Sequence, residues 1–148
     1  RNLYIFVIYI PPKTTTDTYE KLFFAFESMY VIYDSDIVVV GDFNLPNYIN
    51  NTTLTEQSPL HLLNNFINFY DFHQYNNILN HNNRILDLVL SNVRCSVFHS
   101  SDVLLPEDPH HPALLIDFFV PNNVKRIRTQ LSSNINFRKA NFPALYHG

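Results

Sequence analysis

Val38 to Pro46, VVVGDFNLP, is the stretch that decides the fold class of this chain. Its valines are β-branched and precede a turn signal, which predicts a buried β-strand. One of only two glycines follows, and then Asp42 and Asn44 stand two positions apart. Side chains two apart on an extended chain point the same way, so a carboxylate and an amide would leave the strand end together. Because Gly, Asp, Asn and Pro also form turns, a simple turn is the alternative interpretation.

The segments around this stretch alternate between strand and helix patterns. LYIFVIYI (Leu3 to Ile10) predicts a strand with two apolar faces, closed by two prolines. Asp17 to Tyr30 predicts a helix, with Asp17 as its N-cap, and Ser58-Pro59 predicts the start of a second helix that continues to Tyr70. Further segments are a turn region at 76–83 and strands at 37–40, 72–75, 84–90, 103–105 and 113–120. The predicted class is therefore mixed α/β.

Composition limits the kinds of protein that this chain can be. Its 148 residues are 46% hydrophobic, which fits one domain with a packed core. Its first apolar run is much shorter than the roughly 20 residues that cross a bilayer, and it lacks a cleavage pattern. We therefore expect neither a membrane span nor secretion. Cys95 is the only cysteine, which excludes an internal disulfide and is compatible with an intracellular setting.

Charge is distributed unevenly along the chain. Residues 1–120 contain 5 of the 10 Lys and Arg and all 13 Asp and Glu, whereas residues 121–148 contain only basic charges. An acidic body is not the electrostatic footprint of a high-affinity nucleic-acid binder. It is compatible with a site in which carboxylates gather around a divalent cation. The basic segment is interpreted as a solvated linker.

Other candidate residues for chemistry also lie at predicted strand ends. Asp87 interrupts the apolar run RILDLVL, so it either faces solvent or has a polar partner. A histidine partner would be oriented by it, and PEDPHHP supplies His110 and His111 beside Asp108. A zinc site is the competing interpretation of this loop, although its spacing fits no common zinc pattern. Tyr9 ends the first strand, where core packing is the default interpretation.

Four pieces in this order resemble the endonuclease/exonuclease/phosphatase family, which includes DNase I and the apurinic endonucleases. They are YIPP from Tyr9, GDFN from Gly41, LDL around Asp87, and Asp108 followed by histidine and Pro112. Within that family the chain looks most like the endonuclease domain of non-LTR retrotransposons. The resemblance implies a DNase I-like four-layer α-β-β-α sandwich and Mg²⁺- or Mn²⁺-assisted hydrolysis of DNA.

The resemblance also implies a role for each candidate residue. Asp42 would act on the attacking water or the leaving oxygen, and Asn44 and Tyr9 would contact the phosphate. Asp87 would orient the active-site histidine, and Asp108 would lie near the metal ion. The family's Asp is directly followed by its His, whereas this chain has an extra residue at that point. Spacing leaves either histidine open as the functional one, and we favour His111 over His110.

The resemblance further implies how the chain is organised. Residues 1–120 would be the C-terminal part of the endonuclease domain, and 121–148 a basic linker towards a reverse transcriptase in the same protein. The family's Asn and metal-binding Glu would precede Arg1, so we expect the isolated chain to bind metal weakly and to be inactive. The partner would be DNA, and the protein would act in the nucleus. The alternatives are an inactive remnant and a lipid or inositol phosphodiesterase of the same family.

Overall fold

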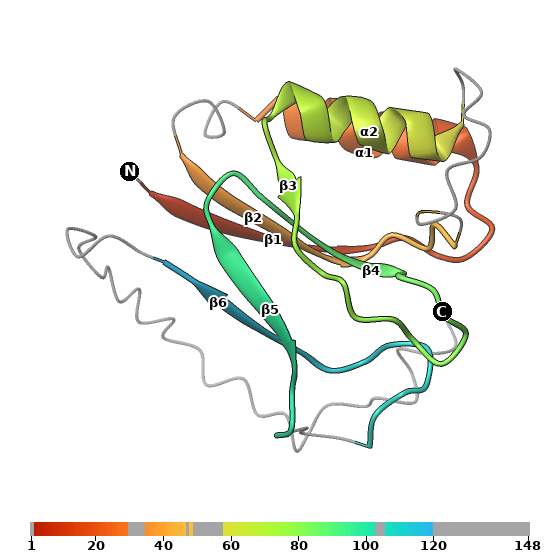
Figure 1. Cartoon of the computed structure of the whole chain (residues 1–148). Coiled ribbons are helices and arrows are strands. Elements are labelled where there is room, and N and C mark those ends of the chain that lie inside the picture. The colour runs from red at the N-terminus through yellow and green to blue at the C-terminus, as the bar shows by residue number, and fades with distance from the viewer. Residues whose placement is uncertain (1, 30–34, 47, 49–57, 103–105, 120–148) are drawn as a thin grey trace, which may run out of the picture.

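A computed structural model describes residues 2–29, 35–46, 48, 58–102 and 106–119 of the chain (Figure 1). The strand predicted at 103–105 and the basic segment 121–148 lie outside the described residues. The described part is mixed α and β, which confirms the predicted class. Neither described helix has the length and apolar character that crossing a bilayer requires.

The described elements form one larger sheet, one smaller sheet and two helices. In chain order they are β1 (Leu3–Tyr9), α1 (Thr16–Glu27), β2 (Asp36–Asp42), α2 (Pro59–Phe69), β3 (His73–Gln74), β4 (Asp87–Ser91), β5 (Cys95–His99) and β6 (Leu114–Phe118). The larger sheet has the strand order β1-β2-β4-β3, in which β1 and β2 are parallel and β4 is antiparallel to both of its neighbours. The smaller sheet is the antiparallel pair β5 and β6.

The two helices differ in how well local signals predicted their starts. Ser58 caps α2 as predicted, because its Oγ accepts a hydrogen bond from the His61 backbone N–H at 3.2 Å. The prediction that Asp17 caps α1 was wrong, since the helix begins at Thr16 after Thr15. Asp17 instead lies in the first turn and pairs with Lys21 at 2.7 Å. A carboxylate in that turn is favoured by the helix dipole, so a first-turn acid resembles a cap in sequence.

The strands were predicted less accurately than the helices. Strand β4 begins at Asp87, three residues after the predicted start. Before it, the carbonyl of Leu86 accepts a hydrogen bond from the Phe43 N–H, beyond the end of β2. Strand β5 was not predicted at all. Apolar and polar residues alternate only weakly along it, and it contains Ser96 and His99. Its order comes from pairing with β6, a strand from a later part of the chain.

The core lies between the helices and one face of the larger sheet. Figure 1 shows both helices on that face and the β5–β6 pair on the other side of the sheet. Aromatic rings fill the helix side: Phe66 stacks on Phe23 with centroids 4.6 Å apart, and Phe26 packs edge-on against Phe66 at 5.2 Å. Buried Tyr19 of α1 donates its hydroxyl to the Phe43 carbonyl at 2.8 Å. The core therefore ties α1 to the turn that follows β2.

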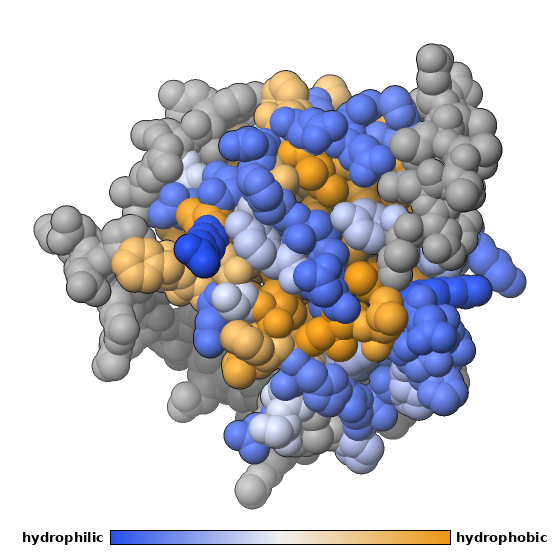
Figure 2. Space-filling model, viewed as in Figure 1, coloured by the Kyte–Doolittle hydropathy of each residue, from blue (hydrophilic) through white to orange (hydrophobic). Residues whose placement is uncertain are grey.

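The opposite face of β1 remains exposed. Ile5, Val7 and Tyr9 are 54%, 80% and 69% exposed, although β1 was predicted to be apolar on both faces. The expectation that Tyr9 packs in the core was therefore wrong, because only the alternate residues of this edge strand face the helices. Figure 2 shows apolar surface emerging between polar side chains on the face viewed there.

Candidate active site

Sheet register brings together three candidate residues that are far apart in sequence. Asp42 pairs with Tyr9 across the parallel β1–β2 ladder, and the same Asp42 pairs with Asp87 across the antiparallel β2–β4 ladder. Paired residues in neighbouring strands project to the same face of a sheet. The side chains of Tyr9, Asp42 and Asp87 therefore form one row at the end of the sheet, on the face away from the helices.

A close approach of two backbones explains the glycine before Asp42. Gly41 pairs with Ile8, and a Cβ at position 41 would lie 1.8 Å from the Ile8 carbonyl oxygen. Its φ of +141° is also a conformation that residues with side chains rarely adopt. Only glycine fits here, so Gly41 allows β2 to continue beside β1 as far as Asp42.

Asn44 holds the carboxylate of Asp42 in place. Its φ of +48° lies in the left-handed region, which asparagine tolerates better than most residues. The Asn44 backbone N–H donates to Asp42 Oδ1 at 2.9 Å. Its side-chain Nδ2 donates to Asp42 Oδ2 at 2.6 Å and to the Ile10 carbonyl at 2.7 Å. Asp42, Phe43 and Asn44 therefore form a local turn at the end of β2, closed by the bond from the Asn44 N–H to the Asp42 side chain, and this turn orients a carboxylate.

This geometry bears on the role that the resemblance implies for Asn44. An amide NH₂ group has two hydrogens, and both are engaged by Asp42 and Ile10. While these bonds are intact, Asn44 has no side-chain N–H to offer a phosphate. In this structure Asn44 orients Asp42 and does not present its amide to the site.

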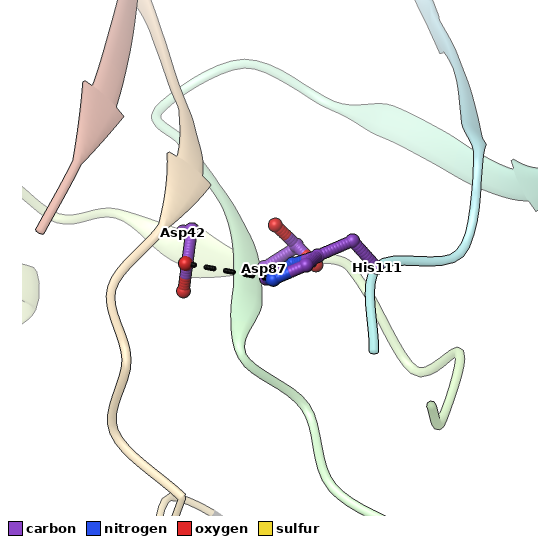
Figure 3. A group of neighbouring side chains, drawn as sticks. All are labelled: Asp42, Asp87 and His111. Atoms are coloured by element: carbon purple, nitrogen blue, oxygen red, sulfur yellow. Dashed lines mark hydrogen bonds and ion pairs between the residues drawn. The ribbon is translucent and has the colours of Figure 1, made fainter. Parts of the chain in front are cut away.

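The ring of His111 contacts both aspartates, and Figure 3 shows it extending from its loop past Asp87 towards Asp42. Its Nδ1 is 2.9 Å from Asp87 Oδ2, which is hydrogen-bond distance. Its Nε2 is 3.8 Å from Asp42 Oδ2. Asp87 therefore has a polar partner, which is one of the two alternatives that the sequence left open for an acid in this apolar strand. Of the two histidines left open by the sequence, His111 is the one that the fold brings against Asp87.

His110 lies apart from this group although it is the next residue. It is exposed, and its Nδ1 is 3.2 Å from the side-chain nitrogen of Asn82. Asp108, the predicted metal ligand, is also exposed, and its Oδ1 accepts from the His110 backbone N–H at 2.8 Å. The structure thus brings His111 to Asp42 and Asp87 but does not bring the side chains of His110 or Asp108 into direct contact with them.

The Asn-rich turn before β4 holds the histidine loop in position. Buried Asn80 donates its side-chain N–H to the His110 carbonyl at 3.1 Å, and the His81 backbone N–H donates to the Pro109 carbonyl at 2.9 Å. Buried Asn76 donates to the carbonyl of Asp87 itself at 2.7 Å. Sequence reasoning treated these asparagines only as a turn. The cluster of asparagines was the available signal, but nothing local indicates which distant loop such side chains will bind.

The environment of the cluster shifts two pKa values. Burial raises the pKa of Asp42, and the hydrogen bonds from Asn44 and the charge of His111 reduce this shift without cancelling it. Partial burial acts to lower the pKa of His111. The hydrogen bond to Asp87 and the charges of Asp87, Asp42 and Asp108 outweigh burial, so the pKa of His111 is raised. His111 therefore holds a proton more firmly than an ordinary histidine, and Asp42 accepts one more readily than an ordinary carboxylate.

The same three residues have a donor set that a divalent cation accepts. Asp42, Asp87 and His111 each offer one ligand atom, and these atoms all lie within 4.8 Å of one another. Carboxylate oxygens suit Mg²⁺ and Mn²⁺, whereas an imidazole nitrogen also suits zinc and other transition metals. The buried thiol of Cys95 is not part of this group.

Comparison of the chain with protein-family models, with curated proteins and with solved structures found no match. The geometry defines an α/β protein in which two aspartates and a histidine converge at one end of a sheet. A function for this site can therefore be proposed only from its chemistry together with the sequence resemblance.

Proposed function

We propose that Asp42, Asp87 and His111 form the centre of a metal-dependent phosphodiesterase that nicks DNA. The observation that carries this proposal is their convergence to within 4.8 Å from three separate segments of the chain. Burying a charged group is costly unless it is paired, and clusters of partly buried ionisable groups with shifted pKa values occur preferentially at functional sites.

His111 would contact the phosphate in the proposed reaction. Asp87 accepts the hydrogen bond from Nδ1 and thereby fixes the ring, which leaves Nε2 on the side of Asp42. Because the pKa of His111 is raised, Nε2 carries a proton over a wider pH range than in an ordinary histidine. A protonated Nε2 can donate to a phosphate oxygen as negative charge develops there.

Asp42 would receive the proton of the attacking water. A general base works best when its pKa lies near the working pH, and burial raises the pKa of Asp42 in that direction. Asn44 holds both carboxylate oxygens, so Asp42 keeps one orientation during proton transfer. Within this cluster the carboxylate of Asp87, which does not take up the proton, is the group that would help to hold Mg²⁺ or Mn²⁺, and the metal would stabilise the charge on the phosphate.

The choice of DNA as substrate rests on the sequence resemblance. YIPP, GDFN, LDL and the Asp–His–Pro loop follow one another as they do in non-LTR retrotransposon endonucleases. The DNase I-like sandwich and the continuation into a reverse transcriptase are part of the same proposal. An inactive remnant is the second candidate, and the exposed apolar face of β1 favours it because a sheet face usually needs a cover.

The test is nicking of supercoiled plasmid by the full chain in Mg²⁺ and in Mn²⁺, with EDTA as the metal-free control. Asp42→Asn is expected to reduce nicking on the order of 10²- to 10⁴-fold, the usual contribution of a general base. Asp117→Asn is the matched control, since Asp117 is an exposed aspartate on β6. Nicking that needs metal and Asp42, but not Asp117, supports the proposal. Because the isolated chain is expected to bind metal weakly, the assay is repeated with an upstream segment that carries the family's Asn and Glu. A wild-type chain that nicks in neither metal, with or without that segment, contradicts the proposal and leaves the inactive remnant as the remaining candidate.

A further inference from the structure

A second polar feature lies next to this cluster, on the helix side of the sheet. It is a pocket of about 410 Å³, a volume within the roughly 300–1,000 Å³ that small-molecule sites occupy. Its wall includes the buried ring of Tyr19 and the side chain of Leu86. Lys13, Thr14, Asn44 and Arg84 supply the polar part of the lining. The pocket thus combines an apolar wall with polar and positively charged groups.

The charge of this pocket differs from that of the acidic body around it. None of the lining residues that the structure describes is acidic. The described part of the chain contains four Lys and Arg residues, and two of them, Lys13 and Arg84, line the pocket. Lys21 is paired with Asp17, whereas neither Lys13 nor Arg84 forms an ion pair with a described residue. Among the described residues, no carboxylate therefore competes with an anionic ligand for these two cations.

The ends of both helices add to the positive potential at this place. Figure 1 shows that α1 and α2 begin at the end of the sheet where β1 and β2 finish. Pro59, the first residue of α2, lines the pocket, and Thr14 lies two positions before the start of α1. The N-terminus of a helix carries a partial positive charge and favours phosphate nearby.

Two residues of the pocket lining adjoin the proposed active site. Asn44 lines the pocket and also hydrogen-bonds both carboxylate oxygens of Asp42. Leu86 lines the pocket and directly precedes Asp87. A ligand that extends around the end of the sheet can therefore reach both places.

We propose that this pocket binds a second phosphate of the substrate strand, next to the phosphodiester that is cleaved. Lys13 and Arg84 would contact this phosphate, and the apolar wall would face the attached nucleoside. The inference rests on the proposed function for the identity of the substrate, and it predicts a preference for polynucleotides over compounds with a single phosphate.

The test measures binding without catalysis. Fluorescence anisotropy of a labelled short oligothymidylate in EDTA gives the Kd of the full chain at several salt concentrations. Lys13→Gln/Arg84→Gln is compared with Lys21→Gln/Arg94→Gln, which removes the same charge from elsewhere in the described part of the chain. The pocket variant is expected to bind roughly tenfold or more weakly than the control variant. Its salt slope is expected to fall by about 0.7 for each phosphate that the two side chains no longer neutralise.

A methylphosphonate oligomer, whose backbone is uncharged, provides the second arm. The pocket variant and the wild type are expected to bind it equally, because Lys13 and Arg84 act on the charge of the phosphate. Equal weakening of both charge variants would overturn the inference, even if Asp42-dependent nicking is found. Selective weakening of oligonucleotide binding in the pocket variant would support a phosphate subsite, even if the chain nicks no plasmid. The two proposals can therefore fail separately.

Discussion

Asp87 hydrogen-bonds His111 through Nδ1 at 2.9 Å and thereby turns the other ring nitrogen, Nε2, to within 3.8 Å of Asp42. One aspartate therefore sets the orientation of the ring, and the second lies beside the nitrogen that remains. This arrangement separates the positioning of the histidine from the chemistry that it could perform.

Asp87→Asn is expected to lower the pKa of His111. Partial burial already acts to lower this pKa, and the hydrogen bond and the negative charge of Asp87 are the largest effects that oppose burial. NMR titration of the His111 ring measures the change, with Asp117→Asn as the control for removal of a surface charge. An unchanged midpoint in Asp87→Asn would mean that the hydrogen bond does not form in solution.

The raised pKa of His111 also determines how the pair affects stability. A histidine whose folded pKa exceeds its unfolded value stabilises the protein fully below the unfolded value. That contribution is lost as the pH rises through the folded pKa. The free energy of unfolding of the wild type is therefore expected to exceed that of Asp87→Asn most at mildly acid pH, while the carboxylates are still ionised. Urea denaturation across the pH range measures this gap, which should narrow as the pH rises.

Gly41→Ala is expected to destabilise the protein by about 3 kcal/mol or more, because it combines a backbone overlap with a positive φ. Urea denaturation measures the loss. Ser96→Ala, at an exposed position of β5, is the control and is expected to stay within about 0.5 kcal/mol of wild type. A small effect at Gly41 would show that β1 and β2 are not held at this spacing.

Asn80→Ala is expected to loosen the loop that carries His111. It removes the bond to the His110 carbonyl and leaves the backbone N–H groups of Asn82 and Arg84 without their acceptor. The free energy of unfolding should therefore fall by about 1–3 kcal/mol. The pKa of His111 should also move closer to its ordinary value. Exposed Asn77→Ala is the matched control. Equal NMR titrations of His111 in both variants would contradict a role for Asn80 in placing the loop.

Tyr9→Phe separates stability from function. The Tyr9 hydroxyl makes no hydrogen bond to a described residue, so the free energy of unfolding should change by less than about 0.5 kcal/mol. If the hydroxyl contacts the phosphate, nicking should fall roughly tenfold or more, which is the effect of removing a hydrogen bond to a charged group. Tyr4→Phe, on the other face of β1, is the control. Full nicking activity of Tyr9→Phe would show that the Tyr9 hydroxyl does not contact the phosphate.

Val7→Thr is expected to reduce self-association without loss of stability. Val7 is 80% exposed on an edge strand, and exposed apolar edges favour aggregation. Light scattering during concentration measures the effect. Val39→Thr changes the same residue type at a fully buried position of β2 and should destabilise the fold instead. Equal scattering by wild type and Val7→Thr would mean that this face does not drive association.

Local signals predicted those features that depend on neighbours in sequence. The start of α2 was predicted because Ser58 and Pro59 act within one helical turn. Strand β5 escaped prediction because its order comes from a partner strand in a later part of the chain. The true start of α1 was missed because an acid in the first turn and an acid at the cap look alike in sequence.

The sequence by itself determined that a strand ends close to Asp42, with Asn44 just beyond it, and that Asp87 and the histidine loop supply further polar groups. Only the tertiary structure decided that Asp42 pairs with Asp87 in the sheet and that His111, not its neighbour His110, reaches both. The physical reason is that strand register and loop placement come from pairing between distant segments. A shift of one residue in the strand register, or in the position of the histidine loop, would turn a different side chain towards the site.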